Sequence, residues 1–427
     1  DMPSLFDEYK EVLGDHFPAE RDGISSYLDY VAATRNRLRE YFATSLLPAP
    51  LTSAVRRLVL RNAHHAAMST TDQVMSEHIR DERLKDVLDA QWGNIGMPRR
   101  RCSFLIHAAM LGCFLERGAY YPNGGSSVFA RELSRTIDEH GSAIRTKAEV
   151  ERVLVERGRA VGVRLTDGEE IRADLVVSTA GVVNTYTRFL GDERALAAER
   201  AAVERFPLNL EYMNLFVGLD ASPAEFGLER ENFWIYRDWD TEPPDGYWDI
   251  RDLEANPAPH LMFVNSSSMR DGEHGRHGNT GHTAQVVFIA RQGVFDEWRN
   301  TRWRKRGEKY EALKGRVADA LIAALDAHLP GLAEHVARTE VSTARTYDTF
   351  SGHPGGVPYG LASTPARYRF RYNRPATPVK GLFLAGQDLV LPGIPAAVGS
   401  AAMALSRILK RNVGSELVQE GRRLYGL

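Results

Sequence analysis

The residues best suited to chemistry lie late in the chain, in the segment 381–402. An apolar run there predicts a buried strand that ends at Gly386 and presents Asp388 directly after it. Asp388 could accept hydrogen bonds from ligand hydroxyl groups. A helix is predicted to follow, and its small first turn would let a flat or anionic ligand approach exposed N–H groups. The small residues are Gly393, Ala396 and Ala397. A strand–helix junction packed for its own sake explains the same pattern equally well.

Other residues whose side chains could bind a metal or take part in a reaction give weaker signals. His274, His277 and His282 could bind zinc, but the glycines between them favour a flexible polar loop, so we predict no metal site. His107 lies in an apolar helical stretch and is more typical of a core histidine than of an acid–base catalyst. The G-x-S-x-G pattern of hydrolases does not occur. No residue can be assigned a catalytic proton transfer.

The charge balance disfavours a nucleic-acid binder. The 427 residues include 54 lysines and arginines and 56 aspartates and glutamates, which gives a formal net charge of −2. Nucleic-acid binders usually carry a clear basic excess. Cys102 and Cys113 lie in an apolar stretch and are predicted to be buried thiols in a reducing cytoplasm.

No apolar run reaches the roughly 18–20 residues that cross a bilayer. The segment 299–309 gathers six basic residues around Trp303. Such a cluster could touch anionic lipid, although a solvated helix start accounts for it as well. We therefore expect a cytoplasmic protein, with a weak membrane-surface contact as a secondary expectation.

The order of the predicted elements indicates an α/β protein with α+β character. Residues 1–120 show mostly helical periodicity, and a helix is predicted over 128–140. A hairpin signal over 160–173 leads into the apolar run 174–181, which suits a strand buried on both faces of a sheet. The remaining predicted elements are a strand-rich region over 207–290, a helix over 303–328, a strand over 380–386 and a helix over 395–411.

Several ordered blocks resemble the phytoene desaturase, carotenoid isomerase and retinol saturase group of FAD-dependent oxidoreductases. The segment 381–402 looks like the C-terminal flavin motif of that group, and 121–127 resembles its Y-P-x-G-G-S turn. The resemblance spans nearly the whole chain. Further blocks look like the central FAD-domain hairpin and strand (147–153, 160–163 and 178–181) or like the retinol saturase and carotenoid isomerase branch (88–94, 232–236 and 359–360).

The resemblance implies a fold and a cofactor. The fold is a Rossmann-type FAD-binding domain like that of glutathione reductase and amine oxidases, joined to a mixed sheet-and-helix substrate domain. Ala396 stands where glycine is common in the family, and its methyl group would crowd the flavin slightly. The expected divisions are a helical part of the substrate domain over 1–120, FAD-binding parts over 121–190 and 346–427, and the rest of the substrate domain over 191–345. The implied cofactor-binding positions are Val150, Ala180, Gly181, Gly386, Gln387, Asp388, Gly393, Ile394, Pro395, Ala396, Ala397 and Val398.

One part of the family pattern is missing. These flavoproteins open with G-x-G-x-x-G on the first strand–helix turn, which holds the pyrophosphate. No G-x-G occurs anywhere in this sequence, which begins with Asp1. We therefore expect the first βαβ unit to lie in a preceding part of a longer gene product, to come from a second polypeptide, or to have been lost.

The resemblance also implies an activity. It points to an FAD-dependent oxidoreductase that acts on carbon–carbon bonds of an apolar, polyene or isoprenoid-like substrate, as a desaturase, saturase or isomerase. The flavin would make or break C–H bonds while the protein orients the substrate and excludes water. The alternative is a non-catalytic subunit or lipid-binding protein that has lost flavin binding. Residues that could line a substrate pocket are Tyr120, Tyr121, Phe233, Trp234, Tyr236, His353 and Tyr359.

Overall fold

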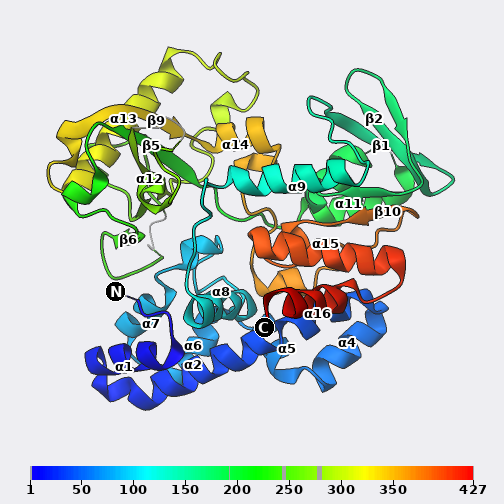
Figure 1. Cartoon of the computed structure of the whole chain (residues 1–427), viewed down its shortest axis with the longest axis horizontal. Coiled ribbons are helices and arrows are strands. Elements are labelled where there is room, and N and C mark those ends of the chain that lie inside the picture. The colour runs from blue at the N-terminus through cyan, green and yellow to red at the C-terminus, as the bar shows by residue number, and fades with distance from the viewer. Residues whose placement is uncertain (1, 192, 243–246, 277–280, 427) are drawn as a thin grey trace. The chain divides into compact units, whose positions relative to one another are not determined.

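A computed structural model describes residues 2–191, 193–242, 247–276 and 281–426 (Figure 1). The chain divides into two compact units. These units follow different boundaries from the predicted divisions, because the first 118 residues share a unit with the segments of the flavin motif. Which unit serves the cofactor and which the substrate stays a prediction. Unit 1 comprises Asp1–Gly118, Ala148–Asn209 and Tyr359–Leu427, and unit 2 comprises Ala119–Lys147 and Leu210–Pro358.

The first part of unit 1 is helical, as the periodicity predicts. Thr70 begins α6 with a reciprocal pair of hydrogen bonds to Gln73, and Asp81 accepts bonds from two N–H groups in the first turn of α7. The helices are α1 (Phe6–His16), α2 (Arg21–Asn36), α3 (Leu38–Ala43), α4 (Ala49–Leu58), α5 (Arg61–Met68), α6 (Thr71–His78), α7 (Glu82–Asp89) and α8 (Phe104–Arg117).

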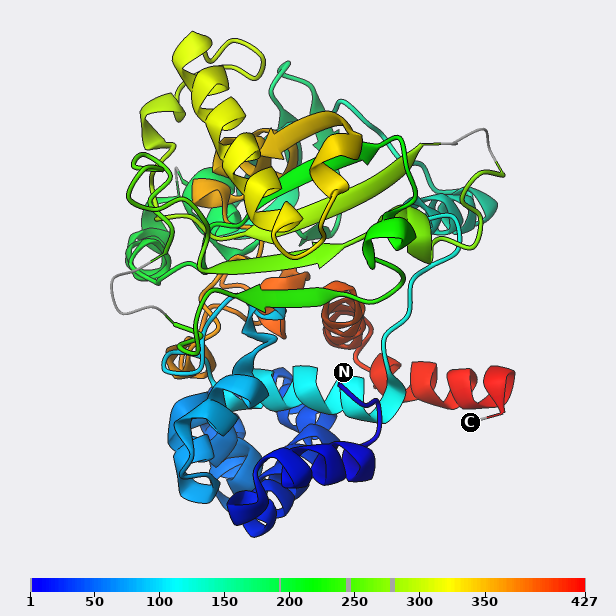
Figure 2. The same cartoon turned by 90° about the vertical axis from the view of Figure 1, so that its left-hand side faces the viewer.

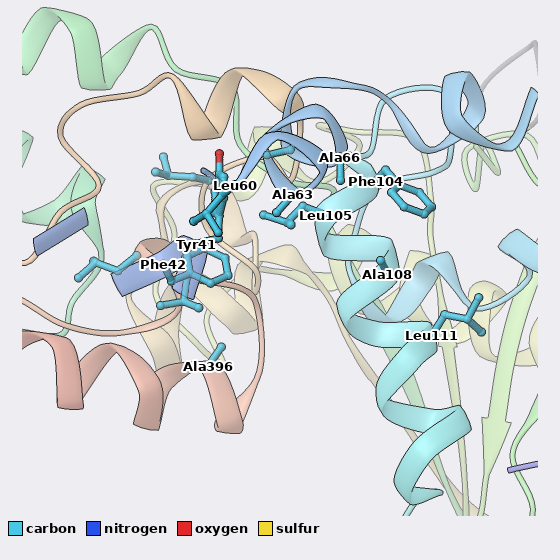
Figure 3. Packing of buried hydrophobic residues seen from close by; sticks show 14 of the residues in the cluster. Tyr41, Phe42, Leu60, Ala63, Ala66, Phe104, Leu105, Ala108, Leu111 and Ala396 are labelled. Atoms are coloured by element: carbon cyan, nitrogen blue, oxygen red, sulfur yellow. The ribbon is translucent and has the colours of Figure 1, made fainter. Parts of the chain in front are cut away.

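Helix α8 contacts both α2 and α5, and the apolar side chains of all three belong to one core cluster. Figure 3 shows the side chains of α8 beside those of α5. His107 on α8 is fully buried, and its Nε2 lies 2.8 Å from the hydroxyl oxygen of Tyr27 on α2. The prediction of a core histidine is therefore confirmed. The prediction that both cysteines are buried is confirmed for Cys102 but wrong for Cys113, which is exposed because the buried stripe of α8 leaves the other side of the helix to solvent.

Two small sheets follow in unit 1. The strands β1, β2 and β3 form an antiparallel sheet in that order, and β4 pairs in parallel with β10 from the far end of the sequence. The expectation that the 174–181 strand is buried on both faces is wrong, since Val177 is 46% exposed on a sheet of two strands. The elements are β1 (Val150–Glu156), β2 (Arg159–Leu165), β3 (Glu170–Arg172), β4 (Val176–Ser178), α10 (Val182–Asn184), α11 (Ala197–Glu204), β10 (Leu382–Leu384), α15 (Ile394–Leu409) and α16 (Val413–Tyr425).

Unit 2 is built on a five-stranded sheet in the order β6-β7-β8-β5-β9, with every neighbouring pair antiparallel. Alternate residues such as Leu215 and Val286 face one core, against which the long helix α13 packs (Figure 2). The predicted helix over 303–328 begins only at Glu308, because Gly307 precedes it with a φ of +85°. The elements are α9 (Ser127–Glu139), β5 (Met213–Leu219), β6 (Phe233–Tyr236), β7 (Leu261–Asn265), α12 (Ser267–Arg270), β8 (His282–Phe288), α13 (Glu308–Asp326), β9 (Val336–Ser342) and α14 (Ala344–Ser351).

The combination of a parallel strand pair, a hairpin sheet and a larger antiparallel sheet agrees with the predicted α/β class with α+β character. Within the described parts of the chain, no helix combines the length and the apolar character that crossing a membrane requires.

The buried histidine gives a prediction for the pH dependence of stability. Burial lowers the pKa of His107 from 6.5 to about 3. Between these values the unfolded chain binds a proton that the folded chain does not, so the free energy of unfolding falls as the pH is lowered through this window. The His107→Gln variant lacks this imidazole. Between about pH 7.5 and about pH 5, its free energy of unfolding should therefore fall by about 2 kcal/mol less than that of the parent. Urea unfolding at both pH values measures the difference.

The matched control is His328→Gln, which replaces an exposed histidine just after α13. This variant should keep the pH dependence of the parent. A parent-like pH dependence in His107→Gln would contradict the expectation.

Candidate functional site

Two parallel strands of unit 1 end at the same edge of their sheet. The strands pair over Val176–Ser178 and Leu382–Leu384, so the turns that follow them leave the sheet together. Gly181 and Gly386 occupy these turns with φ values of +88° and +108°, which residues with a side chain rarely adopt. In open α/β sheets this edge is where ligands bind, because the backbone can approach them there.

Asp388 follows β10 and is only 4% exposed. Its Oδ2 accepts a hydrogen bond from the N–H of Val182 at 2.8 Å, and its Oδ1 accepts one from Leu361 at 3.0 Å. A Cβ on Gly360 would lie 2.2 Å from Oδ1, so glycine is needed to leave room for this contact. The carboxylate therefore joins three segments of unit 1 and is not presented freely at the strand end. Each oxygen can accept one further bond, and the contact with a ligand hydroxyl stays a prediction.

Arg367 is fully buried beside the same corner. Its two terminal nitrogens donate to the carbonyl oxygens of Leu361 at 2.6 Å and Gln387 at 2.7 Å. Buried cations usually pair with a carboxylate. Among the described residues, however, no carboxylate lies within 4 Å of Arg367, and its Nε has no hydrogen-bond partner. Sequence reasoning missed this residue because a single arginine in a loop carries no recognisable pattern.

Helix α15 is tied to the turn after β10. The hydroxyl of Ser400 accepts a hydrogen bond from the N–H of Gly386 at 2.7 Å and donates to the carbonyl of Ala397 at 2.6 Å. Ile394 and Val398 are 55% and 60% exposed. The first turn of α15 therefore presents apolar side chains beside N–H groups that have no partner within the helix.

Ala396 lies on the opposite side of α15. It is nearly buried and belongs to the same apolar cluster as Tyr41 and Phe42 of α3 (Figure 3). Its methyl group packs into the core of unit 1 and not on the exposed side of the helix. The departure from the family pattern at this position is therefore accommodated by packing within the unit.

The remaining predicted cofactor positions also fall in unit 1. Ala180 follows β4, and Gln387 follows β10. Val150 begins β1 of the three-stranded sheet, which is joined to the β10 segment through a hydrogen bond from the N–H of Ala160 to the carbonyl of Lys380 at 2.8 Å.

This corner fits a flat cofactor that carries phosphate groups. The glycine turns leave the backbone open to close approach, and the first turn of α15 offers N–H groups at the positive end of a helix dipole. Gly393, directly before that helix, adopts a φ of +103° and adds a third such turn. The exposed apolar side chains beside it suit the face of a ring.

The aromatic residues predicted to line a substrate pocket on β6 lie on two faces of one sheet. Phe233 packs against the buried core of unit 2. Trp234 and Tyr236 face the other side, because side chains alternate along a strand. On that side the rings of Trp234 and Phe263 lie 4.6 Å apart between their centroids.

The other predicted substrate residues fall in both units. Tyr120 is 90% exposed in unit 2, and the guanidinium of Arg270 lies 4.8 Å above the ring centre of Tyr121. His353 is half-buried in unit 2, whereas Tyr359 belongs to unit 1. A shared role in substrate binding stays a prediction for these residues.

The described ranges of the chain contain no group of three or more His, Cys, Asp or Glu residues that could hold a metal ion. The rings of His274 and His282 lie 5.6 Å apart between their centroids. His277 lies outside the described residues.

Three comparisons with known proteins bear on this arrangement. A family profile described as flavin containing amine oxidoreductase matches residues 33–408. The chain is 28% identical to an all-trans-retinol 13,14-reductase from Danio rerio, over 97% of this chain and 70% of that protein. It is 25% identical to a chloroplastic prolycopene isomerase from Arabidopsis thaliana, over 95% of this chain and 64% of that protein. A solved putrescine oxidase shares the fold with a TM-score of 0.56 and 13% identity, over 90% of this chain and 76% of that one.

The buried carboxylate gives a prediction for stability. In Asp388→Asn the amide nitrogen cannot accept a hydrogen bond, so one of the two backbone N–H groups loses its acceptor. We expect the free energy of unfolding to fall by about 1–3 kcal/mol. Denaturant unfolding measures the loss. Asp319→Asn removes the same charge at an exposed site on α13 and should change stability by less than about 0.5 kcal/mol. Equal losses in the two variants would argue against the role assigned to Asp388.

Proposed function

The chain belongs to the flavin-containing amine oxidoreductase family and is a flavin oxidoreductase, and we propose that its cofactor is FAD and its substrate an apolar polyene. The observation that carries the cofactor proposal is the corner of unit 1 where the turns after β4 and β10 meet the start of α15. The substrate proposal is supported by the relatives, whose names describe action on retinol and on prolycopene.

The residues of the corner would hold FAD through their backbone. Gly181 would line the adenine nucleotide, Gly386 would lie against the pyrophosphate and ribityl parts, and the first turn of α15 would lie under the ring. Asp388 fixes both turns, and Arg367 holds the carbonyl of Gln387 in place. When bound, the flavin supplies hydride transfer to and from carbon.

The chain's own contribution is to bind, orient and exclude water. The second face of the unit 2 sheet suits an apolar chain, because its polar groups bond to one another. Gln285 donates to Asn214 at 2.8 Å, and Asn214 donates to the hydroxyl of Tyr347 at 2.8 Å. Beside them lie the half-buried rings of Trp234 and Phe263. A polyene offers no hydrogen-bond partner, so it would leave these bonds intact.

A further FAD-binding segment would complete unit 1, on the same or a second polypeptide. It would supply the glycine-rich phosphate turn that this sequence lacks. Apolar surface on β4 and α15 supports its docking here, because proteins normally bury contiguous apolar patches. The exposed residues apart from those beside the proposed ring position are Val177 on β4 and Leu405 and Leu409 on α15.

The cofactor proposal predicts that the protein binds FAD and that a bulky side chain at the start of α15 weakens this binding. We expect visible absorption bands of oxidised flavin and quenching of FAD fluorescence on titration. Ala397→Phe should weaken binding at least about tenfold, which corresponds to roughly 1.4 kcal/mol. Ala198→Phe, at an exposed position on α11, should bind FAD as the parent does.

The outcomes of this titration separate the alternatives. Failure of the 427 residues to bind FAD, with binding restored in a native complex of larger mass, would support the further segment. Failure in every form of the protein would contradict the cofactor proposal and favour the non-catalytic alternative.

The substrate proposal predicts conversion of a polyene by the FAD-loaded protein. With dithionite as reductant, all-trans-retinol or prolycopene should give a product with a new retention time. A gain of two hydrogens in its mass spectrum identifies saturation, and an unchanged mass identifies isomerisation. Ala397→Phe should lower the rate in proportion to the flavin that it fails to bind. An FAD-loaded protein that leaves both polyenes unchanged would contradict the substrate proposal but not the cofactor proposal.

A further inference from the structure

Unit 2 contains a pocket of about 530 Å³ at the β9 edge of its sheet, and none of the residues named above for the flavin or the polyene lines it. It is formed by the edge strand β9, the neighbouring strand β5, the first turns of α13, helix α14 and the loop 303–306. Every residue that lines it belongs to unit 2. Its size lies within the range of roughly 300–1,000 Å³ that small-molecule sites occupy.

Exposed aromatic side chains form one wall of the pocket. The rings of Trp303 and Phe350 meet edge to face at 5.0 Å between their centroids, yet they are 46% and 65% exposed. Phe216 on β5 is also 46% exposed. Three large aromatic side chains that face solvent around one hollow mark a surface that binds an apolar group.

Four cations and two carboxylates also line the pocket, so the positive charges are only partly compensated; they are Arg304, Arg306, Lys314 and Arg338 against Glu311 and Glu340. Lys314 lies near Glu340 and Glu311, at 2.5 and 3.5 Å. Arg304 instead lies over the ring of Trp303, 4.4 Å from its centre. No carboxylate in the described part of the chain lies within 4 Å of Arg304 or Arg338, which both line the pocket.

Arg306 adds a positive charge that is more than nine-tenths buried. One of its terminal nitrogens donates to the carbonyl of Arg345 and to the hydroxyl of Thr349, both at 3.0 Å. Its Nε has no hydrogen-bond partner, and again no carboxylate of the described residues lies within 4 Å. A buried guanidinium without a counter-charge is costly, and an anion in the pocket would offset that cost.

We propose that this pocket binds a phosphate ester whose alcohol part is aromatic or otherwise apolar. The phosphate oxygens would accept hydrogen bonds from Arg304, Arg306 and Arg338, whose forked donors match phosphate. The apolar part would cover the rings of Trp303 and Phe350. A small soluble ester and the head-group region of a phospholipid offer this same chemistry.

The first test is calorimetric titration of the full protein with phenyl phosphate, in the presence of added FAD so that any nucleotide site is filled. Phenyl phosphate should bind at least about tenfold more tightly than either inorganic phosphate or phenol. Inorganic phosphate lacks the aromatic ring, and phenol lacks the phosphate group. Equal affinity for phenyl phosphate and phenol would overturn the role of the arginines.

The second test uses charge-removing variants. Replacing both exposed arginines, Arg304→Gln with Arg338→Gln, should weaken phenyl phosphate binding at least about tenfold and leave FAD binding unchanged. Arg316→Gln removes the same charge from an exposed site on α13 outside the pocket and should bind as the parent does. Parent-like binding by the double variant, or an equal loss in Arg316→Gln, would overturn the proposal.

Vesicles distinguish the two sources of the phosphate. Co-sedimentation with phosphatidic acid vesicles but not with pure phosphatidylcholine, lost in the double variant, assigns the pocket to a lipid head group. Binding of phenyl phosphate without co-sedimentation assigns it to a soluble ester. A protein that binds neither phenyl phosphate nor the acidic vesicles contradicts the proposal.

Discussion

The carboxylate of Asp388 accepts hydrogen bonds from the backbone of Val182 and of Leu361, which lie in separate segments of unit 1. A buried carboxylate is tolerated only where such donors compensate for the water it has lost. The turns after β4 and β10 must therefore keep their positions for the charge to stay buried. Arg367 reinforces the same corner by donating to the carbonyls of Leu361 and Gln387. Ser400 connects α15 to this junction, because its hydroxyl accepts a hydrogen bond from the N–H of Gly386.

Local sequence patterns were sufficient to predict the elements of this corner. The apolar run before Gly386 forms β10, and the small residues after Gly393 form the first turn of α15. The partners of Asp388 could not be predicted, because Val182 lies 206 positions away and its backbone N–H carries no sequence signature. The direction in which Ala396 points depends on where α3 packs, which periodicity alone does not determine.

In unit 2, too, the local sequence predicts the elements but not the contacts between distant segments. The aromatic run at the start of β6 was predicted to line one pocket, whereas strand alternation sends Phe233 to the core and Trp234 to the other face. The sequence of the basic cluster around Trp303 predicts a solvated helix start or a lipid contact. In the structure the helix begins later, and Trp303, Arg304 and Arg306 of the cluster line a pocket with Phe350. The pocket could not be predicted from the cluster alone, because the ring that packs against Trp303 is that of Phe350 on α14.

Because β4 pairs with β10, it must wait for its partner strand during synthesis of the chain. At about 5–20 residues per second, a ribosome needs roughly 10–40 s to cover the distance from Val182 to Asp388. Throughout that interval the edge of β4 that β10 later covers lacks this partner, and unpaired edges are templates for aggregation. The yield of active protein in a cell should therefore depend on how well nascent chains are shielded during this delay. The corner that would hold the cofactor is thus also a part of the protein that forms late during synthesis.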